Sequence, residues 1–435
     1  MNVIIGIRRE DKNRWESRVP LVPQDVKRLI DNYDVKIVVQ PSTIRAFPDR
    51  EFIDVGAGIK EDISDSQFVF AVKEIPIDFF VPNKTYIFFS HTIKGQSYNM
   101  SMLKRMMKLG CTLIDYERIL DEKGRRLIAF GRYAGLAGML DTLWAFGKRL
   151  EWKGINNPFA KIKRGYKYSS IKEAKEHIET IGKEIIEDGI HKSISPVVCG
   201  FMGYGNVSKG AQEILDCLPI EELEPDTLLS STYSSNRVIY KTVFKESDMV
   251  ESTSENPFDL LDYYHNPSGY QSKFNKFIPY ITILMNCIYW ESKYPRFVTK
   301  QYLKEYSGKE DFRLRIIGDI SCDIEGAVEC TVHSTEPDKP VYVYDPFTDT
   351  TKDGYKGEGV VIMAVDNLPC ELPLESSAFF SNTLMKFIPN IIKANFPEKF
   401  DECNLPDEVK KGVILYKGKL TEEYRYLKKY IRVDR

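Results

Sequence analysis

A lysine and a histidine each follow a short apolar run in the first hundred residues, and both side chains could transfer protons. Lys73 stands in FAVKEIP and His91 stands in YIFFSHTIKGQ. In an open α/β sheet the carboxyl ends of the strands form the ligand crevice, so this placement would put an acid/base pair beside a substrate. A surface charge for the lysine and a hydrogen-bonded core histidine are the competing interpretations.

A glycine-rich turn indicates a second kind of chemistry. The segment VVCGFMGYGNVSKGAQEIL is typical of an apolar strand, a tight turn and a helix. Gly203 would make the turn, and Gly205 would let the backbone approach a pyrophosphate at the helix N-terminus. Ser208 replaces the usual third glycine. A merely tight strand-to-helix turn is the alternative.

The form of the nucleotide depends on charges farther along the chain. An acid about twenty residues beyond the glycine turn would bind the ribose hydroxyls of NAD(H). Glu222 and Glu224 stand near that position, whereas Arg237 could meet the 2′-phosphate of NADP(H). A solvated charge near a turn is the alternative for each. The residues leave both nucleotides open, and NADP(H) is expected over NAD(H).

Arginines gather after the first apolar run, in IGIRREDKNRWESRVPLVP, and again in RRLIAFGRYAGLAG. A guanidinium can bind a carboxylate through two parallel hydrogen bonds, so such clusters suit a polycarboxylate ligand. Solvated arginines in loops are the alternative.

These side chains require a scaffold that brings strand ends together. Short β-branched runs alternate with helix-length stretches at the start of the chain and again from SPVVCGFM onward, which is typical of βαβ units. We therefore expect an α/β fold with two doubly wound, Rossmann-like lobes flanking a substrate cleft. Residues 1–135 with 370–435 would form the substrate and catalytic lobe, and residues 136–369 the dinucleotide-binding lobe. Small residues around Gly135 fit either a hinge between the lobes or ordinary close packing of a helix.

Composition excludes several classes of protein. The chain has 435 residues, which requires more than one hydrophobic core, and 43% of them are hydrophobic, which excludes global disorder. With 61 basic and 63 acidic residues, it has no overall positive charge to attract nucleic acid. The eight cysteines form no CxxC pair, which indicates reduced thiols and no zinc site. MNVIIGIRRE resembles neither a signal peptide nor a membrane span, so we expect a cytoplasmic protein, or a mitochondrial matrix protein if a presequence is missing.

The motifs also occur together in a familiar order. IRREDKNRWESRVPL, AVKEIP, FFSHTIKGQ, GRRLIAFGRYAGLAGML, GYGNVSKGAQ, NCIYW, GDIS and AVDNLP follow the order of the lysine-ketoglutarate reductase domain of animal and plant aminoadipic-semialdehyde synthases. The chain resembles that family over nearly its whole length. It shares the architecture of fungal lysine-forming saccharopine dehydrogenases and, more distantly, of alanine dehydrogenases and transhydrogenase domains.

The resemblance implies an NAD(P)-dependent oxidoreductase acting on CH–NH groups, which joins L-lysine to 2-oxoglutarate to give saccharopine or runs the reverse reaction. It implies Lys73 and His91 as the acid/base pair, and Arg18 as the residue that holds the dicarboxylate end. The other positions that match substrate-binding residues are Gln96, Arg126, Phe130 and Tyr289. The positions that match cofactor-binding residues are Arg125, Gly203, Tyr204, Gly205, Asn206, Val207, Asp319, Ile320 and Ser321. No metal is expected.

Two other functions remain open on the residues. One is an alanine dehydrogenase-like enzyme that uses ammonia, and the other is a non-catalytic dinucleotide-binding protein. The expected partners are lysine, 2-oxoglutarate and saccharopine, with neither nucleic acid nor a membrane. The expected oligomeric state is a monomer or a small homo-oligomer.

Overall fold

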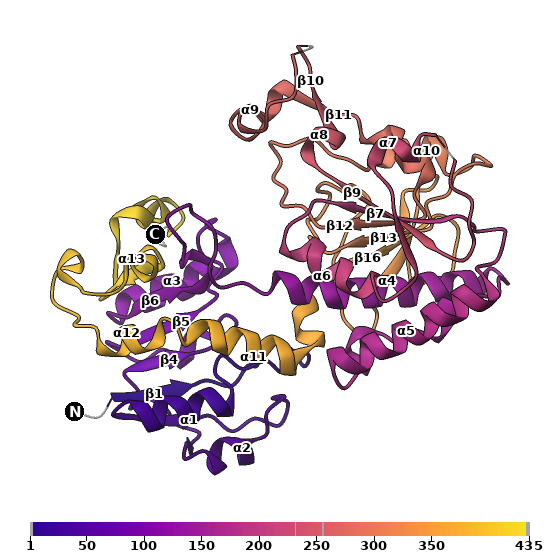
Figure 1. Ribbon diagram of the computed structural model, residues 1–435. Helices are drawn as coiled ribbons and strands as arrows, with labels where there is room; N and C mark the ends of the chain where they lie inside the picture. Colours follow the sequence, from indigo (N-terminus) through magenta and orange to yellow (C-terminus); the bar gives the residue numbers. More distant parts are fainter. Residues whose placement is uncertain (1–2, 231, 255, 432–435) are drawn as a thin grey trace. The chain divides into compact units, whose positions relative to one another are not determined.

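The computed structural model describes residues 3–230, 232–254 and 256–431, and the chain divides into two compact units (Figure 1). The first unit is Met1–Phe130 with Pro373–Arg435, and the second is Gly131–Leu372. Each unit contains one eight-stranded sheet in which parallel pairs predominate, which confirms the expected α/β class. None of the helices in the described ranges is long and apolar enough to cross a membrane.

The sheet of the first unit has the order β18-β17-β6-β5-β4-β1-β2-β3. Its strands are β1 (Val3–Ile7), β2 (Val35–Val39), β3 (Gly58–Ile59), β4 (Phe68–Phe70), β5 (Thr85–Phe88), β6 (Thr112–Asp115), β17 (Val413–Tyr416) and β18 (Lys419–Leu420). Strands β1 to β6 pair in parallel, and β17 is antiparallel to β6. Because β1 lies between β2 and β4, the strand order reverses beside β1. In such sheets the ligand crevice opens at this reversal.

Apolar burial explains why these segments form a covered sheet. Every residue of β4, β5 and β6 is buried, as expected for parallel strands with helices on both faces. The helices of this unit are α1 (Pro23–Asn32), α2 (Asp49–Asp54), α3 (Ser97–Lys108), α11 (Pro373–Leu384), α12 (Ile388–Lys393) and α13 (Asp407–Lys411). Phe380, Ile388 and Val413, from the returning segment, belong to the same hydrophobic core as the N-terminal strands.

The sheet of the second unit has the order β15-β14-β16-β13-β12-β7-β9-β8. Its strands are β7 (Val197–Met202), β8 (Ile220–Glu222), β9 (Ile239–Phe244), β12 (Ile283–Asn286), β13 (Ile316–Asp319), β14 (Val341–Asp345), β15 (Thr350–Asp353) and β16 (Val360–Met363). A small antiparallel pair, β10 (Val250–Ser252) and β11 (Tyr270–Ser272), lies between β9 and β12 in the chain. The helices are α4 (Gly131–Trp152), α5 (Ile171–Asp188), α6 (Asn206–Leu215), α7 (Pro225–Leu228), α8 (Glu246–Met249), α9 (Leu260–His265) and α10 (Lys300–Tyr306). Strand β7 lies between β12 and β9, and β8 lies at the edge of the sheet beyond β9.

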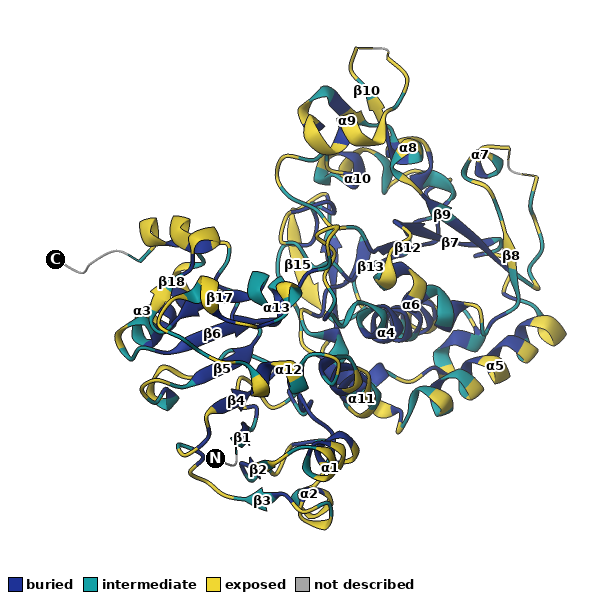
Figure 2. Ribbon diagram, turned by 60° about the vertical axis from the view of Figure 1, so that its left-hand side comes forward, coloured by how far each residue is buried: buried dark blue, intermediate teal, exposed yellow. Residues whose placement is uncertain are grey.

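Two helices of the second unit pack at very short range. A Cβ atom on Gly135 would lie 2.0 Å from the Val207 carbonyl oxygen, and one on Gly210 would lie 2.0 Å from the Arg132 carbonyl oxygen. Figure 2 shows α4 largely in the dark blue of buried residues. The small-residue face around Gly135 is therefore accounted for by close packing of α4 on α6 within one unit.

Two buried carboxyl groups also meet in the second unit. Asp141 accepts a hydrogen bond from the Gly165 amide (2.8 Å), and Glu371 accepts one from the Tyr166 amide (3.1 Å). Within the described residues, Oδ2 of Asp141 and Oε1 of Glu371 have no other donor. Burial raises the pKa of Asp141 to about 6, and burial together with Asp141 raises the pKa of Glu371 well above its usual range. We infer that the pair shares one proton.

This shared proton predicts a loss of stability in alkali. Because the folded-state pKa values lie above the ordinary values of 3.8 and 4.5, the contribution is fully present below those values. It is lost as the pH rises through the folded-state values, about 6 for Asp141 and higher for Glu371. Glu371→Gln supplies a permanent amide donor to Asp141, so we expect a flatter dependence of Tm on pH between 5 and 9 than in the wild type. The control is Glu358→Gln, at an exposed position paired with Lys153. Parallel Tm curves for wild type and Glu371→Gln would contradict the shared proton.

Candidate active site

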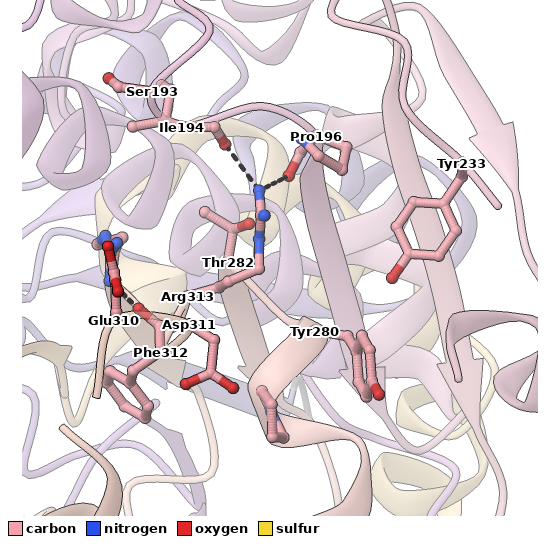
Figure 3. Close-up of a pocket in the computed structure, with 12 residues that line it drawn as sticks. Ser193, Ile194, Pro196, Tyr233, Tyr280, Thr282, Glu310, Asp311, Phe312 and Arg313 are labelled. Carbon is pink, nitrogen blue, oxygen red and sulfur yellow. Dashed lines mark hydrogen bonds between the residues drawn. The ribbon is translucent and has the colours of Figure 1, made fainter. Parts of the chain in front are cut away.

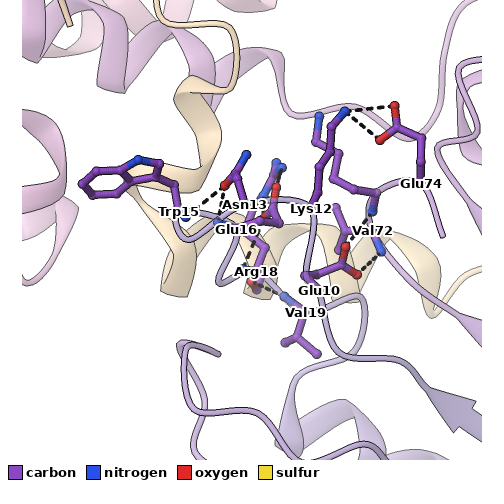
Figure 4. Close-up of polar contacts among 11 residues, drawn as sticks. Glu10, Lys12, Asn13, Trp15, Glu16, Arg18, Val19, Val72 and Glu74 are labelled. Carbon is purple, nitrogen blue, oxygen red and sulfur yellow. Dashed lines mark hydrogen bonds and ion pairs between the residues drawn. The ribbon is translucent and has the colours of Figure 1, made fainter. Parts of the chain in front are cut away.

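The loops after β4 and β5 of the first unit carry the two expected proton-transfer residues. Lys73 lies three residues beyond β4, and His91 lies three residues beyond β5. The two strands pair in parallel, so both residues leave the sheet at the same edge. The loop after β1, the strand at which the order reverses, contributes further charged side chains to this edge (Figure 4).

Glu74 connects these loops. It accepts hydrogen bonds from Nδ1 of His91 (2.7 Å) and from the Lys12 ammonium (2.8 Å), the latter visible in Figure 4. Burial alone would raise the pKa of Glu74, but the bonds from His91 and Lys12 hold it below its ordinary range. An ionised carboxylate can only accept, so Nδ1 of His91 carries a proton and Nε2 is the nitrogen that can face a substrate. Our sequence interpretation missed Glu74, although it directly follows Lys73.

The backbone around His91 is held in an unusual conformation. His91 has φ +47°, in the left-handed region that favours glycine. The Asn99 side chain donates to the carbonyls of Ser90 (3.0 Å) and His91 (3.1 Å), and the Ser90 hydroxyl donates to the buried Asp115. These bonds stabilise a conformation that would otherwise be costly, and such outliers cluster at functional sites.

Lys73 is half-buried, and its charge is not compensated by a direct ion pair with a described residue. Its backbone amide donates to Glu10 (3.0 Å), but its ammonium makes neither a hydrogen bond nor an ion pair with any residue that the structure describes. Burial and the nearby Arg18 guanidinium lower the pKa of Lys73. Burial also raises the pKa of Glu10 to about 7, so that carboxyl compensates the lysine poorly near neutral pH. An amine in this environment loses its proton more readily than an ordinary lysine, as a general base must.

Arg18 is held rigidly in the same region. Its Nε and Nη2 donate to Glu16 at 2.7 and 2.5 Å, and both residues are buried. The Arg18 guanidinium lies 4.3 Å from the ring centroid of Phe130, which stacks on Phe380 at 4.6 Å. A planar cation fixed in this way is suited to orienting a carboxylate. The role of Glu16 in holding it was not foreseen.

The other residues of the first unit that the resemblance implied are Gln96, Arg125 and Arg126, and their surroundings differ from one another. Gln96 precedes α3, and its Oε1 atom is buried with no donor among the described residues. A buried acceptor without a partner is costly, so this amide suits a ligand N–H or ammonium group. Arg126 pairs with Glu117 and is half exposed, and Arg125 pairs with Asp121 at 2.7 Å and is mostly exposed. The structure therefore groups Arg18, Lys73, His91 and Phe130 more tightly than the two arginines.

The glycine turn of the second unit has the form that a nucleotide requires. Gly203 has φ +89°, and a Cβ atom on it would lie 2.9 Å from the Ile288 side chain. A Cβ atom on Gly205 would meet no described heavy atom within 4 Å, and no side chain caps the first turn of α6 there. Open space above free amides suits a pyrophosphate. Ser208 is buried, and its hydroxyl accepts from Gln212 at 2.9 Å.

A cavity of about 400 Å³ adjoins this turn, at the carboxyl ends of β7, β9 and β12. The Gly203 amide donates to the Phe244 carbonyl (3.0 Å), which places the turn beside the end of β9. Tyr204 and Tyr289 are both largely exposed at the cavity, and the Tyr289 hydroxyl donates to Glu291. The cavity is lined by Gly203, Tyr204, Gly205, Glu246, Met249, Tyr263, Tyr264, Cys287, Ile288, Tyr289, Trp290, Tyr294 and Phe297.

The expected residues at the end of β13 bind mainly other parts of the protein. Asp319 is fully buried and accepts from Asn286 (2.8 Å), Thr331 (2.5 Å) and the Cys322 amide (3.1 Å). Burial raises its pKa to about 6. The Ile320 side chain packs on Gly138 of α4, and the Ser321 hydroxyl donates to the Ile288 carbonyl (2.5 Å). These side chains position the loops around the cavity.

A second cavity, of about 440 Å³, lies at the opposite edge of the same sheet (Figure 3). Pro196, Thr282 and Arg315 line it, and each directly precedes a strand of the sheet. The Arg313 guanidinium donates to the Pro196 carbonyl (2.7 Å). Ligands of open α/β sheets bind at the carboxyl ends, so the cavity beside Gly203 is the stronger candidate.

Comparison with known protein families shows which family this chain is related to. The model described as "Alanine dehydrogenase/PNT, N-terminal domain" matches residues 6–137, and "Alanine dehydrogenase/PNT, C-terminal domain" matches residues 290–423. The chain belongs to the alanine dehydrogenase/PNT family. A solved L-alanine dehydrogenase superposes with a TM-score of 0.63 and 15% identity, covering 99% of this chain and 100% of that one, which shows the shared fold.

Curated relatives are more similar to this chain in sequence than that structure is. The chain is 36% identical over 441 residues to the mitochondrial alpha-aminoadipic semialdehyde synthase of Bos taurus, covering 98% of this chain and 48% of that protein. It is 29% identical over 397 residues to the saccharopine dehydrogenase [NAD(+), L-lysine-forming] of Emericella nidulans, covering 88% of this chain and 90% of that protein. The chain thus spans about half the length of the synthases it matches. The resemblance drawn from the motifs is confirmed.

Proposed function

We propose that this chain catalyses the reductive condensation of L-lysine with 2-oxoglutarate to saccharopine, or its reversal, with a nicotinamide nucleotide. The observation that carries the proposal is the position of Lys73, a half-buried lysine of lowered pKa, at the same sheet edge as the hydrogen-bonded Glu74 and His91. The names of the relatives, a semialdehyde synthase and a lysine-forming saccharopine dehydrogenase, agree with chemistry on lysine.

The proton transfers of this reaction match the two groups. The ε-ammonium of lysine must lose a proton before its nitrogen attacks the keto carbon of 2-oxoglutarate, and neutral Lys73 can take that proton. The resulting carbinolamine loses water when its hydroxyl is protonated, a step that His91, held through Nδ1 by Glu74, can assist through Nε2. Arg18 would orient a substrate carboxylate, and Gln96 would accept a hydrogen bond from a substrate ammonium.

The cofactor would bind at the glycine turn of the second unit. The open space at Gly205, the uncapped first turn of α6 and the adjoining cavity fit a dinucleotide. When bound, the reduced nicotinamide would supply the hydride that converts the protonated imine to the secondary amine. Tyr204, Asn206, Val207 and the loop after Asp319 would surround the nucleotide, and Tyr289 a substrate or the nucleotide.

The test is absorbance at the reduced-nicotinamide band with purified protein, lysine and 2-oxoglutarate. Oxidation that requires both compounds supports the proposal. Oxidation with ammonia and an oxo acid, without lysine, would indicate an alanine dehydrogenase-like enzyme. Nucleotide binding without turnover would indicate a non-catalytic dinucleotide-binding protein. The cytoplasmic or mitochondrial location and the monomeric or small homo-oligomeric state stay predictions.

A further inference from the structure

One carboxylate stands beside the glycine turn, on a strand other than the one that the sequence spacing indicated. Glu246 follows the end of β9 by two residues and lines the cavity with Gly203 and Gly205. The Gly203 amide donates to the Phe244 carbonyl, so the turn lies beside the start of α8, which carries Glu246. In dinucleotide-binding sheets an acid next to the glycine turn binds the adenosine ribose.

Glu224, one of the three residues first considered for this role, does not line the cavity, and the other two are engaged elsewhere. Glu222 ends the edge strand β8 and forms an ion pair with Lys241 at 2.8 Å, so it is separated from β7 by the whole of β9. Arg237 precedes β9, at its amino end, and donates to the Glu187 carbonyl (2.6 Å). Neither side chain lines the cavity.

Glu246 is the only charged residue among the described residues that line the cavity, and none of them is lysine or arginine. The Tyr264 hydroxyl donates to Glu246 at 2.7 Å. Burial raises the pKa of Tyr204, and the Glu246 carboxylate raises it further. The adjacent Lys245 is exposed and does not line the cavity. A ribose with two hydroxyls can replace these phenol donors, whereas a 2′-phosphate would meet a carboxylate with no cation in the cavity wall.

We propose that Glu246 selects NAD(H) over NADP(H) by accepting hydrogen bonds from the adenosine ribose and repelling a 2′-phosphate. The inference rests on the proposed function only in that a nicotinamide nucleotide binds at the glycine turn. It replaces the expectation of NADP(H) from the sequence.

Direct titration with NADH and with NADPH, without lysine or 2-oxoglutarate, tests the inference independently of turnover. The wild type is expected to bind NADH on the order of tenfold or more tightly than NADPH. Glu246→Gln keeps the size of the side chain and removes its charge, so the Kd for NADPH should fall by about tenfold, while the Kd for NADH rises. Glu222→Gln, the acid that spacing alone indicated, should leave the ratio of the two Kd values unchanged.

Several outcomes would overturn the inference. They are tighter binding of NADPH by the wild type, a Kd ratio that Glu246→Gln leaves unchanged, or a Kd ratio that follows Glu222→Gln instead. Thermal unfolding of each variant shows whether it is folded, and NADH binding by the folded protein reports on the site itself. Selective NADH binding without turnover would count against the proposed reaction but not against Glu246.

Discussion

Lys73→Met is expected to lower kcat by about a hundredfold or more, because a single general base typically contributes that much to a proton transfer. The fall in kcat should not be accompanied by a fall in Tm. The Lys73 ammonium is desolvated and makes no direct ion pair with a described residue, so an apolar side chain of similar length should leave Tm unchanged or raise it. The measurement is the initial rate of nicotinamide oxidation with saturating lysine and 2-oxoglutarate, together with thermal unfolding.

The pH dependence separates a base from a merely structural lysine. Because the pKa of Lys73 is lowered, the neutral form becomes populated at a lower pH than for an ordinary lysine, and kcat/KM should rise with pH through that value. Residual activity of Lys73→Met should lack this rise. Lys60→Met, at an exposed position of the same unit, serves as the control. Full turnover by folded Lys73→Met would remove Lys73 from the mechanism.

Gly205→Ala is expected to weaken nucleotide binding and Gly210→Ala to lower stability, although the two positions are only five residues apart. Gly205 has φ −76° and open space, so its methyl group is tolerated by the fold but occupies the space proposed for the pyrophosphate. The Kd for the nucleotide should rise by about tenfold or more at unchanged Tm. The methyl group of Gly210→Ala would lie 2.0 Å from the Arg132 carbonyl oxygen and should lower the free energy of unfolding by about 3 kcal/mol.

Each variant is the control for the other. Thermal unfolding and nucleotide titration of both proteins separate a binding defect from a packing defect. Normal nucleotide affinity in Gly205→Ala would mean that the turn does not hold the phosphates. A normal Tm in Gly210→Ala would mean that α4 and α6 can move apart at no cost.

Features that depend on neighbouring residues in the chain could be predicted from the sequence. The alternation of apolar runs predicted two α/β sheets, and the positions of Lys73 and His91 directly after apolar runs put them at strand ends. The glycine turn was likewise a local signal. In each case one short segment contains both the strand and the residue that follows it.

Features that depend on strand order could not be predicted in this way. Glu74 matters because the loops after β1, β4 and β5 meet, which brings Lys12 and His91 to one carboxylate. Glu246 lies beside the glycine turn because β9, and not β8, pairs with β7. A fixed spacing of about twenty residues assumes that the second strand in the chain is the neighbour of the first, and here it is at the edge.

The first unit is built from two segments of the chain that are separated by the whole second unit, and this has a consequence during synthesis on the ribosome. Residues up to Phe130 emerge first, but β17 and the core residues Phe380 and Ile388 belong to the last segment. Until that segment emerges, β6 has an unpaired edge that can associate with other strands. At about 5–20 residues per second the delay lasts many seconds. The second unit of the nascent chain can therefore fold while the first unit still lacks its last segment. During that interval, chaperone binding should be strongest to the first 130 residues.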